Sequence, residues 1–422
     1  MEEHQINIRM FRPMESYQKY GGVLTFARSV GYAVVKKPEG YTTAKVDQII
    51  QEYEKKSANE QQSTAKQYPN IITVVNETFA DIKVLGDFKT NEDYMPYFHS
   101  LKKNCVTGYT YASIVGGQTA NTEFELLTGN TLGFLSAGTT AFQLYIHGQM
   151  PSLVSNLKAE GYSGNKAMHP FNPYNYNRPA VYKDFGFTDF IDKFDFPKNV
   201  KRVREYISDE ANVDRIISEY EKNRKKTDQP FYMYNMTIQN HSPYDKDAAN
   251  FKQPIKIESS KYDAEANRYL NLIKYSDDSL KQLTSYFEKC KEPTIILFLG
   301  DHQPRLTDEF MNKITNGQYQ TWSSEQMMKR YQVPFVIWAN YDIKEQHIEK
   351  TSMNYIQSIL TKTAGVKMTG YQRFLNEVRK EVPTITSQGY WGKNGKFYQI
   401  NDKGSPYYGI IQKYLSLIHI SE

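Results

Sequence analysis

The chain has little cysteine: its 422 residues include only Cys105 and Cys290, which lie far apart in the sequence. One distant pair cannot supply a disulfide framework. Such low cysteine use suits a bacterial protein that works in the cytosol, or outside the membrane without disulfide bridges. The sequence therefore excludes the class of small secreted domains that disulfides hold together.

Long hydrophobic runs are also missing. A membrane-spanning helix needs about 20 mostly apolar residues, whereas the longest purely aliphatic and aromatic run here is Ile295–Leu299. The N-terminal sequence MEEHQINIRMF lacks the basic and apolar regions of a signal peptide. We therefore expect the chain as given to be soluble.

The net charge is small. Lys and Arg total 52 against 47 Asp and Glu, which gives +5, and this balance does not indicate a nucleic-acid-binding surface. Hydrophobic residues make up 39% and charged residues 23% of the chain, as in globular proteins. We expect no nucleic-acid partner.

Three zones can be distinguished along the chain. Residues 1–68 form an approach segment with an amphipathic helix near Val46–Tyr53 and a polar linker, KKSANEQQSTAKQYPN. Residues 69–366 form the main domain, and residues 367–422 a small α+β subdomain. In that subdomain an Asn394-Gly395 pair between aromatic residues predicts a β-hairpin.

The main domain alternates short apolar runs with helical patterns. The runs predict strands, and apolar residues at helical spacing predict the intervening helices, 214–226 and 262–289. This alternation predicts an α/β fold with a mainly parallel central sheet flanked by helices. The predicted strands cover residues 71–75, 231–236, 294–299 and 333–338.

Polar residues follow three of these strands. Glu77 comes after the first, Asp301 and His302 after the third, and His241 after the second. Each could be a turn cap or an ordinary hydrogen-bonded residue. Because ligands bind at the carboxyl ends of strands in such sheets, each is also a candidate site residue.

Two further candidates lie between these strands. His169 follows a glycine-containing stretch, and Arg178 follows a run of Tyr, Phe and Pro. Arginine suits bidentate recognition of phosphate or carboxylate, although a single arginine is ordinarily a surface residue.

Thr119 follows Gly116-Gly117-Gln118 and precedes a helical pattern that begins at about Asn121. A hydroxyl at a helix N-terminus can be an ordinary cap. It can also lie where backbone N–H groups favour an anion.

Together the candidates indicate one chemistry. Glu77, Asp301 and His302 form an oxygen-rich ligand set with one nitrogen, which suits Mn²⁺ or Mg²⁺ and is also accepted by Zn²⁺. A metal bound to Thr119 would make its hydroxyl a nucleophile. Arg178 and the other two histidines, His169 and His241, could then hold a phosphate and its leaving group. This pattern predicts metal-assisted phosphoryl or sulfuryl transfer through a covalent threonine.

The same residues occur in ordered blocks that resemble lipoteichoic acid synthase-like phosphoglycerol transferases of the sulfatase and alkaline phosphatase superfamily. The resemblance covers roughly residues 69–366. The blocks are Pro69–Phe79, Gly117–Phe124, Asn177-Arg178, Asn240-His241 and Gly300-Asp301-His302. Two positions depart from the pattern of the best-known members, which carry Trp in place of Tyr176 and often Lys in place of Gln118.

This resemblance implies a role for each matching residue. It implies that Glu77, Thr119, Asp301 and His302 bind one metal ion, usually Mn²⁺, and that Thr119 is also the nucleophile. Arg178, His241 and His169 would hold the substrate.

The resemblance also implies the reaction and its place. Thr119 would accept glycerol phosphate from phosphatidylglycerol and pass it to a cell-envelope polymer, glycolipid or glycan. The implied location is the extracellular face of the bacterial membrane, with membrane attachment through a segment absent from this chain.

Three alternatives remain from the sequence. A phosphodiesterase or a phosphoethanolamine transferase could use the same scaffold, and a non-catalytic module could bind teichoic acid, although its metal set would then be expected to be broken. A formylglycine sulfatase is not expected, because neither cysteine lies in a Cys-x-Pro-x-Arg motif. We further expect the chain to be a fragment and residues 415–422, with His419, to be non-native.

Overall fold

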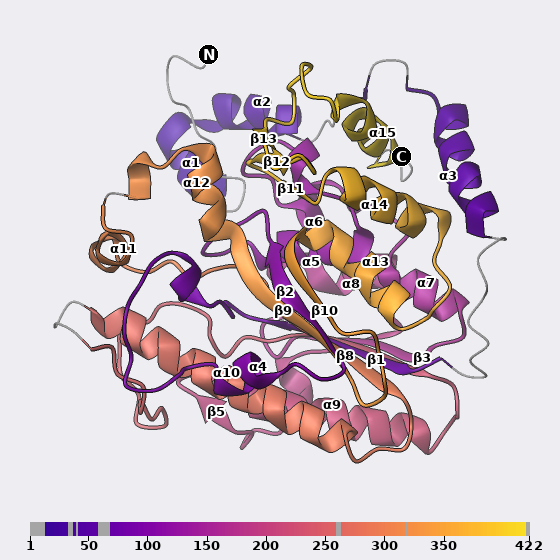
Figure 1. Ribbon diagram of the computed structural model, residues 1–422. Helices are drawn as coiled ribbons and strands as arrows, with labels where there is room; N and C mark the ends of the chain where they lie inside the picture. Colours follow the sequence, from indigo (N-terminus) through magenta and orange to yellow (C-terminus); the bar gives the residue numbers. More distant parts are fainter. Residues whose placement is uncertain are drawn as a thin grey trace.

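An eight-stranded sheet forms the centre of the computed structural model, which describes residues 13–32, 37–38, 41–57, 68–258, 263–317 and 319–418. The strand order is β10-β2-β9-β8-β1-β7-β3-β4 (Figure 1). In chain order the strands are β1 (Asn70–Asn76), β2 (Cys105–Tyr111), β3 (Ser163–Met168), β4 (Asp189–Ile191), β7 (Phe231–Met236), β8 (Thr294–Gly300), β9 (Gln332–Ala339) and β10 (Gln346–Ser352).

Seven of these strands run in one direction. The pairs β10–β2, β8–β1, β1–β7, β7–β3 and β3–β4 are parallel, whereas β9 is antiparallel to both β2 and β8. The predicted mainly parallel α/β sheet is therefore confirmed. Strand β9 is the exception, so its carboxyl end lies away from the edge at which β1, β7, β8 and β3 end.

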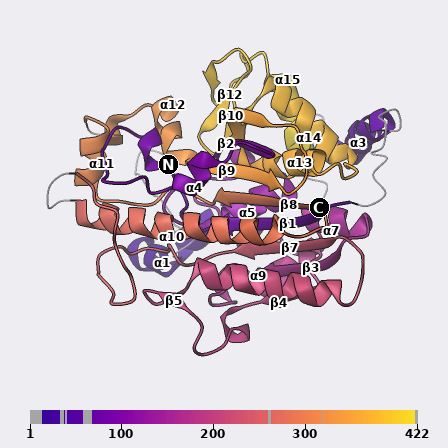
Figure 2. The same ribbon diagram turned by 60° about the horizontal axis from the view of Figure 1, so that its bottom comes forward.

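Helices cover both faces of the sheet, as Figures 1 and 2 show. Alternate residues of β1 point to opposite faces: Ile71 and Val75 belong to one core cluster, and Ile72 and Val74 to the other. One face packs against α9 (Asp209–Arg224), α10 (Ala264–Phe287) and α11 (Asp308–Ile314). The other packs against α5 (Thr119–Thr128), α7 (Leu153–Ala159), α8 (Arg178–Phe185), α13 (Met353–Thr363), α14 (Gly370–Glu381) and α15 (Tyr408–Ile418).

Shorter elements complete the chain. The predicted hairpin is present, because β12 (Gly389–Trp391) pairs antiparallel with β13 (Phe397–Tyr398) and with β11 (Thr384–Thr386). A second small sheet joins β5 (Arg202–Val203) to β6 (Tyr206–Ile207). The remaining helices are α1 (Pro13–Tyr20), α2 (Gly22–Tyr32), α3 (Thr43–Ser57), α4 (Pro96–Ser100), α6 (Ala141–Leu144) and α12 (Ser324–Met327).

Several predicted boundaries shift. Helix α3 contains the predicted 46–53 segment, and α9 begins five residues before the predicted start, where Ser208 caps it. Part of the predicted linker, residues 58–67, lies outside the described residues, as do residues 419–422. The division of the chain into three zones stays a prediction. Among the described helices, none combines the length and apolar character needed to cross a membrane.

The end of β8 is packed too closely for any side chain at Gly300. A Cβ atom there would lie 1.8 Å from the backbone oxygen of Phe79, in the loop that follows β1. The loop after β1 therefore touches the backbone at the end of β8. Because β1 and β8 pair in parallel up to Asn76 and Gly300, the residues that follow them, Glu77 and Asp301, lie side by side.

We predict that Gly300→Ala lowers the free energy of unfolding by about 3 kcal/mol or more, because the backbone of one loop must move. Gly409→Ala is the matched control, since a Cβ atom at this position in α15 meets no atom within 4 Å. Urea denaturation measures both. Equal stability of the two variants would contradict the close packing described here.

Candidate active site

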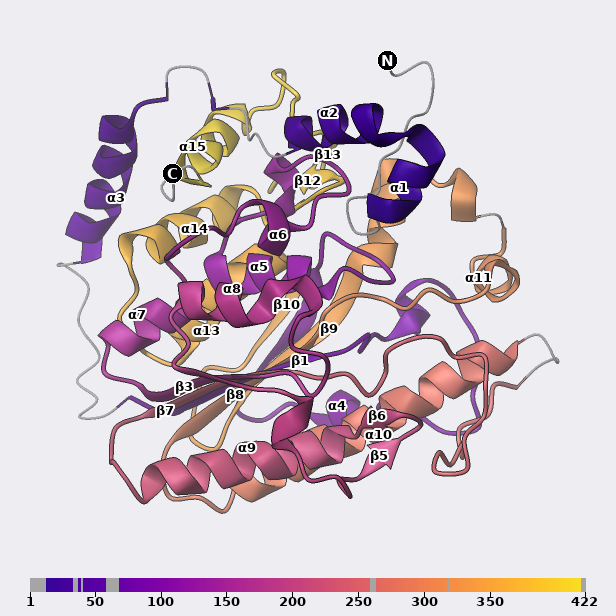
Figure 3. The same ribbon diagram turned by 180° about the vertical axis from the view of Figure 1, so that it is seen from behind.

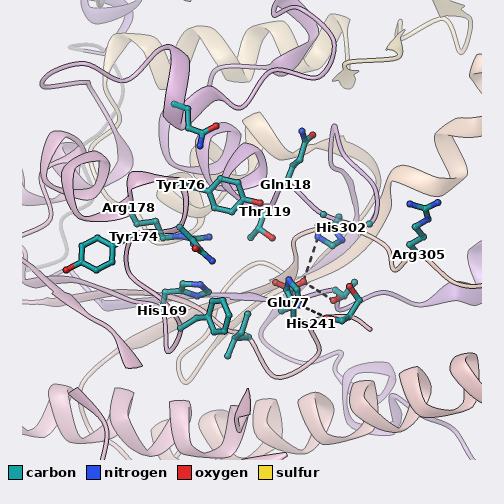
Figure 4. A pocket seen from close by; sticks show the side chains of 18 of the residues that line it. Glu77, Gln118, Thr119, His169, Tyr174, Tyr176, Arg178, His241, His302 and Arg305 are labelled. Atoms are coloured by element: carbon teal, nitrogen blue, oxygen red, sulfur yellow. Dashed lines mark hydrogen bonds and ion pairs between the residues drawn. The ribbon is translucent and has the colours of Figure 1, made fainter. Parts of the chain in front are cut away.

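A cavity of about 500 Å³ opens at the edge of the sheet where the parallel strands end. Six of the seven predicted site residues line it, and Figure 4 shows them converging from different loops. Asp301 is fully buried next to His302 and does not line the cavity. The six lining residues are Glu77, Thr119, His169, Arg178, His241 and His302.

Glu77, Asp301 and His302 form the acidic end of this site. All three are buried, and one potential ligand atom from each lies within 4.8 Å of the other two. The Nε2 atom of His302 lies 3.2 Å from Asp301 Oδ2 and 3.8 Å from Glu77 Oε1. Asp301 Oδ2 and His302 Nε2 nevertheless have no hydrogen-bond partner in the described part of the chain.

Hydrogen bonds fix the orientation of these ligand atoms. The backbone N–H groups of Thr78 and His302 donate to Asp301 Oδ1 at 2.7 and 2.8 Å, which leaves Oδ2 free. The Nδ1 atom of His302 donates to the carbonyl of Gln303 at 2.9 Å. In the neutral ring this hydrogen bond leaves the lone pair on Nε2, which is the atom that a metal-binding imidazole uses.

The two buried carboxylates at this end of the site favour the binding of a cation. Burial, followed by the negative charge of Asp301, raises the pKa of Glu77 to about 8. Two buried carboxylates, of which Asp301 has an unpartnered oxygen, next to an imidazole nitrogen are the donor set of an Mn²⁺, Mg²⁺ or Zn²⁺ site. The residues fit a divalent cation in both chemistry and orientation.

Asn240 and Asp209 support Glu77 from behind. The side-chain amide of Asn240 donates to the carbonyl of Glu77 at 3.0 Å and to the side chain of Asn76 at 3.1 Å. Asn76 in turn donates to the buried carboxylate of Asp209 at 2.8 Å. This polar network connects β1, the loop after β7, and the first turn of α9.

Thr119 is the first residue of α5, two residues earlier than the predicted start of the helix. The cap position is occupied by Gln118, which has a left-handed backbone with φ 67° and whose side chain makes no capping hydrogen bond. Within the described structure, the Thr119 hydroxyl makes no hydrogen bond, and the residue faces the cavity. The simple interpretation of Thr119 as a helix cap is therefore wrong.

Two hydrogen bonds join the Thr119 loop to the loop after β8. The Thr122 hydroxyl donates to the carbonyl of Asp301 at 2.8 Å, and the N–H of Gly116 donates to the carbonyl of Gln303 at 3.0 Å. These two hydrogen bonds fix the segment that carries Thr119 against the loop that carries Asp301 and His302.

Arg178 begins α8 on the opposite wall, and its guanidinium is buried against Glu123. Its Nε and Nη2 atoms donate to Glu123 Oε1 at 3.1 and 2.7 Å. The hydroxyls of Tyr182 and Tyr234 both donate to Glu123 Oε2. Because the pair leaves other N–H groups of Arg178 unused, the guanidinium can still bind an anion.

His169 follows β3 and donates from Nδ1 to the carbonyl of Met236 at 2.9 Å. Burial, and then the positive charge of Arg178, hold the pKa of His169 well below its ordinary value. The ring is therefore neutral at physiological pH, and its Nε2 atom can accept a proton or a hydrogen bond from a ligand.

His241 lies half-buried in the loop after β7. Its Nδ1 atom donates to the carbonyl of Ser242 at 2.6 Å, and its ring stacks on Phe171 with centroids 6.3 Å apart. The side chain of Arg204 fixes the loop by donating to the carbonyls of Gln239 and His241 at 2.8 and 2.7 Å. The structure thus brings His241 to the same cavity as the other candidates.

Sequence reasoning missed two charged residues of this site. Glu123 lies four residues after Thr119, so both occupy one face of α5, and this spacing is a signal that could have been used. Arg305 is exposed and lines the cavity beyond His302. Only its position after the Asp301-His302 pair could have suggested it.

The sulfatase family model matches residues 69–366, more than half of the chain. The chain therefore belongs to the sulfatase family.

Named relatives agree with the predicted resemblance. A Rhizobium meliloti protein, the putative cyclic beta-1,2-glucan modification protein, is 31% identical over 395 residues, covering 92% of this chain and 59% of the relative. The Bacillus subtilis lipoteichoic acid synthase-like protein YvgJ is 27% identical over 237 residues, covering 55% of this chain and 36% of the relative. The chain thus spans well under two thirds of both relatives.

A solved structure shares the fold. The phosphoglycerol transferase GacH of Streptococcus pyogenes, in complex with sn-glycerol-1-phosphate, matches with a TM-score of 0.72. The match covers 91% of this chain and 94% of that chain at 20% identity. This likeness concerns the fold, and it confirms the predicted fold class.

We predict that Mn²⁺ raises the melting temperature, because a ligand that binds only the folded state stabilises it, by about 2.7 kcal/mol at a hundredfold excess over Kd. Asp301→Asn should remove most of this increase, while Asp245→Asn, an exposed residue near the site, should keep it. Differential scanning calorimetry with and without Mn²⁺ measures the effect. A full increase in Asp301→Asn would contradict the proposed ligand set.

We predict that Glu123→Gln lowers the free energy of unfolding by about 3 kcal/mol, because it leaves the buried Arg178 guanidinium without its countercharge. The exposed pair Lys380–Glu377 provides the control, and Glu377→Gln should cost less than about 1 kcal/mol. Guanidinium chloride denaturation compares the two. Equal small losses would mean that the buried pair contributes no more than a surface pair.

Proposed function

We propose that this chain is a metal-dependent phosphotransferase that moves glycerol phosphate from phosphatidylglycerol to a glycan or polymer of the cell envelope. The observation that carries this proposal is the position of the Thr119 hydroxyl. It faces the cavity without a hydrogen-bond partner in the described structure. Glu77 and His302 of the metal-ligand cluster line the same cavity, as do Arg178, His169 and His241.

The metal-ligand candidates define what a cofactor would add. A divalent cation held by Glu77, Asp301 and His302 would supply positive charge that favours the ionised form of the Thr119 hydroxyl. The sequence resemblance favours Mn²⁺ among the ions that fit.

The chain's own residues account for the first half of the reaction. Thr119 Oγ1 attacks the phosphorus of phosphatidylglycerol, and the bond from phosphorus to the diacylglycerol oxygen breaks. Arg178 binds the phosphoryl oxygens, because its guanidinium is held in place by Glu123. Diacylglycerol leaves with a proton, and glycerol phosphate stays on Thr119 as a phosphodiester.

The second half restores the enzyme. A hydroxyl of the acceptor attacks the same phosphorus, Thr119 Oγ1 leaves, and it recovers a proton. The Nδ1 atoms of His169 and His241 donate to backbone carbonyls, so in the neutral rings the lone pair lies on Nε2. These lone pairs can accept hydrogen bonds from the glycerol hydroxyls, or the proton of the incoming hydroxyl.

The lining of the cavity favours phosphoglycerol over phosphoethanolamine. Among the described residues that line the cavity, Glu77 is the only acidic one, and we assign it to the metal. An ammonium group would therefore find no free carboxylate among these lining residues.

The name of one relative supports the choice of acceptor, and the lipid donor supports a location at the membrane. A Rhizobium meliloti relative is named for modification of cyclic beta-1,2-glucan, which supports a glycan acceptor. A lipid donor places the reaction at a membrane surface, and we propose the extracellular face of the cytoplasmic membrane.

We predict that the purified chain with Mn²⁺ releases diacylglycerol from labelled phosphatidylglycerol and carries phosphoglycerol on the Thr119 peptide. Thr119→Ala should lose the adduct and at least about a thousandfold in turnover, because a nucleophile that acts with its partners cannot be replaced. Mass spectrometry of peptides and chromatography of the lipid products measure both.

Thr119→Ser is the matched variant, since it keeps a hydroxyl and should keep part of the activity. Both variants should melt near the wild-type temperature, because the Thr119 hydroxyl caps nothing. Release of free glycerol phosphate by the wild type without any adduct would favour a phosphodiesterase instead.

A further inference from the structure

Each of the N-terminal helices α1 and α2 has two exposed large apolar side chains and a buried small polar side chain. Val23 and Phe26 of α2 are 88% and 64% exposed, whereas Thr25 between them is fully buried. In α1, Met14 and Tyr17 are exposed and Ser16 is buried. A surface helix of a globular protein ordinarily has the opposite arrangement.

A hydrogen bond accounts for the inward face. The Thr25 hydroxyl donates to the backbone carbonyl of Ser16 at 3.1 Å. This hydrogen bond joins the two helices at the buried residues Thr25 and Ser16. We call the exposed apolar residues of these two joined helices, Met14, Tyr17, Val23 and Phe26, the α1–α2 apolar face.

This face concentrates the exposed apolar surface of the protein. Among the described residues, six large hydrophobic side chains are exposed, and four of them belong to α1 and α2. A fifth, Tyr174, lines the active-site cavity. Grouped exposed apolar residues mark an interaction surface, whereas scattered ones need no explanation.

The face lies at the catalytic end of the molecule. Figures 1 and 3 show α1 at the end where α11 lies, and α11 follows the loop that carries Asp301 and His302. A surface that binds at this end would approach the carboxyl edge of the sheet, where the cavity opens.

We propose that the α1–α2 apolar face binds the surface of a lipid bilayer that contains anionic lipid, and so brings the cavity to its lipid donor. Helices of 8 and 11 residues are too short to span a membrane, which needs about 20 residues, but they can lie in its interface. This contact is separate from any spanning segment.

Charge and aromatic residues beside the face fit this occupant. Lys19 is exposed in the last turn of α1, with its ammonium 5.1 Å from the ring centroid of Tyr20. Lysine and tyrosine beside exposed Val and Phe are typical of helices that bind anionic membrane surfaces.

Vesicle binding tests the proposal without relying on catalysis. The full chain should sediment with vesicles of phosphatidylcholine and phosphatidylglycerol, and Val23→Ser/Phe26→Ser should weaken its partition at least about tenfold, because two exposed apolar side chains no longer enter the interface. Phe194→Ser, which removes a side chain that is 73% exposed outside α1 and α2, is the matched control and should bind as the wild type does.

Three results would overturn the proposal: no vesicle binding by the wild type, equal binding by the double variant, or wild-type dimers that the double variant abolishes. The last result would assign the face to a second copy of the chain. Light scattering and circular dichroism on each variant give the oligomeric state and the fold.

An activity comparison tests whether the α1–α2 apolar face assists the proposed function, on which this role of the face rests. On vesicles the double variant should release diacylglycerol at least about tenfold more slowly than the wild type. On dispersed short-chain phosphatidylglycerol the two rates should be equal, and equal losses on both substrates would contradict the membrane role. If no protein turns over either substrate, the proposed function fails while the vesicle-binding result still stands.

Discussion

Two buried carboxylates that face each other are the constraint on which the rest of the site depends. Glu77 and Asp301 lie at the ends of adjacent parallel strands, both are buried, and their negative charges repel each other. Such an arrangement is costly unless a cation neutralises it. Three contacts fix the orientation of the ligand atoms in this cluster. They are the backbone contact at Gly300, the two N–H groups that donate to Asp301 Oδ1, and the hydrogen bond from His302 Nδ1 to the carbonyl of Gln303.

The Arg178–Glu123 pair is a second buried group of charges in the site, and here a negative charge neutralises a positive one. The Arg178 guanidinium is buried against Glu123, which lies one turn after Thr119 on the same helix. Helix α5 therefore carries both the candidate nucleophile and the anchor of the anion-binding arginine. A displacement of α5 would move both groups together, so the distance between nucleophile and phosphate depends on one rigid element.

Much of this arrangement could be predicted from the sequence. The strands before Glu77, His241 and Asp301 are short apolar runs followed by polar residues, so the parallel topology brings those residues to one edge. The direction of β9 could not be predicted, because an apolar run such as 333–338 does not reveal whether its strand is parallel or antiparallel. The role of Glu123 was missed because its partners, Arg178, Tyr182 and Tyr234, come from two other elements of the chain. The outward apolar face of α1 and α2 depends on how two helices pack, which a helical pattern alone does not specify.

We propose above all that the cluster of Glu77, Asp301 and His302 binds a metal ion beside the Thr119 hydroxyl. Arg178 lies opposite this hydroxyl and would bind the phosphate. Anomalous diffraction from crystals grown with Mn²⁺ and glycerol phosphate tests it most directly. We expect one strong manganese peak at about 2.0–2.3 Å from an oxygen of each carboxylate and from His302 Nε2, and a phosphate between Thr119 and Arg178. A peak bound by other residues, or a phosphate that contacts neither Thr119 nor Arg178, would contradict the claim.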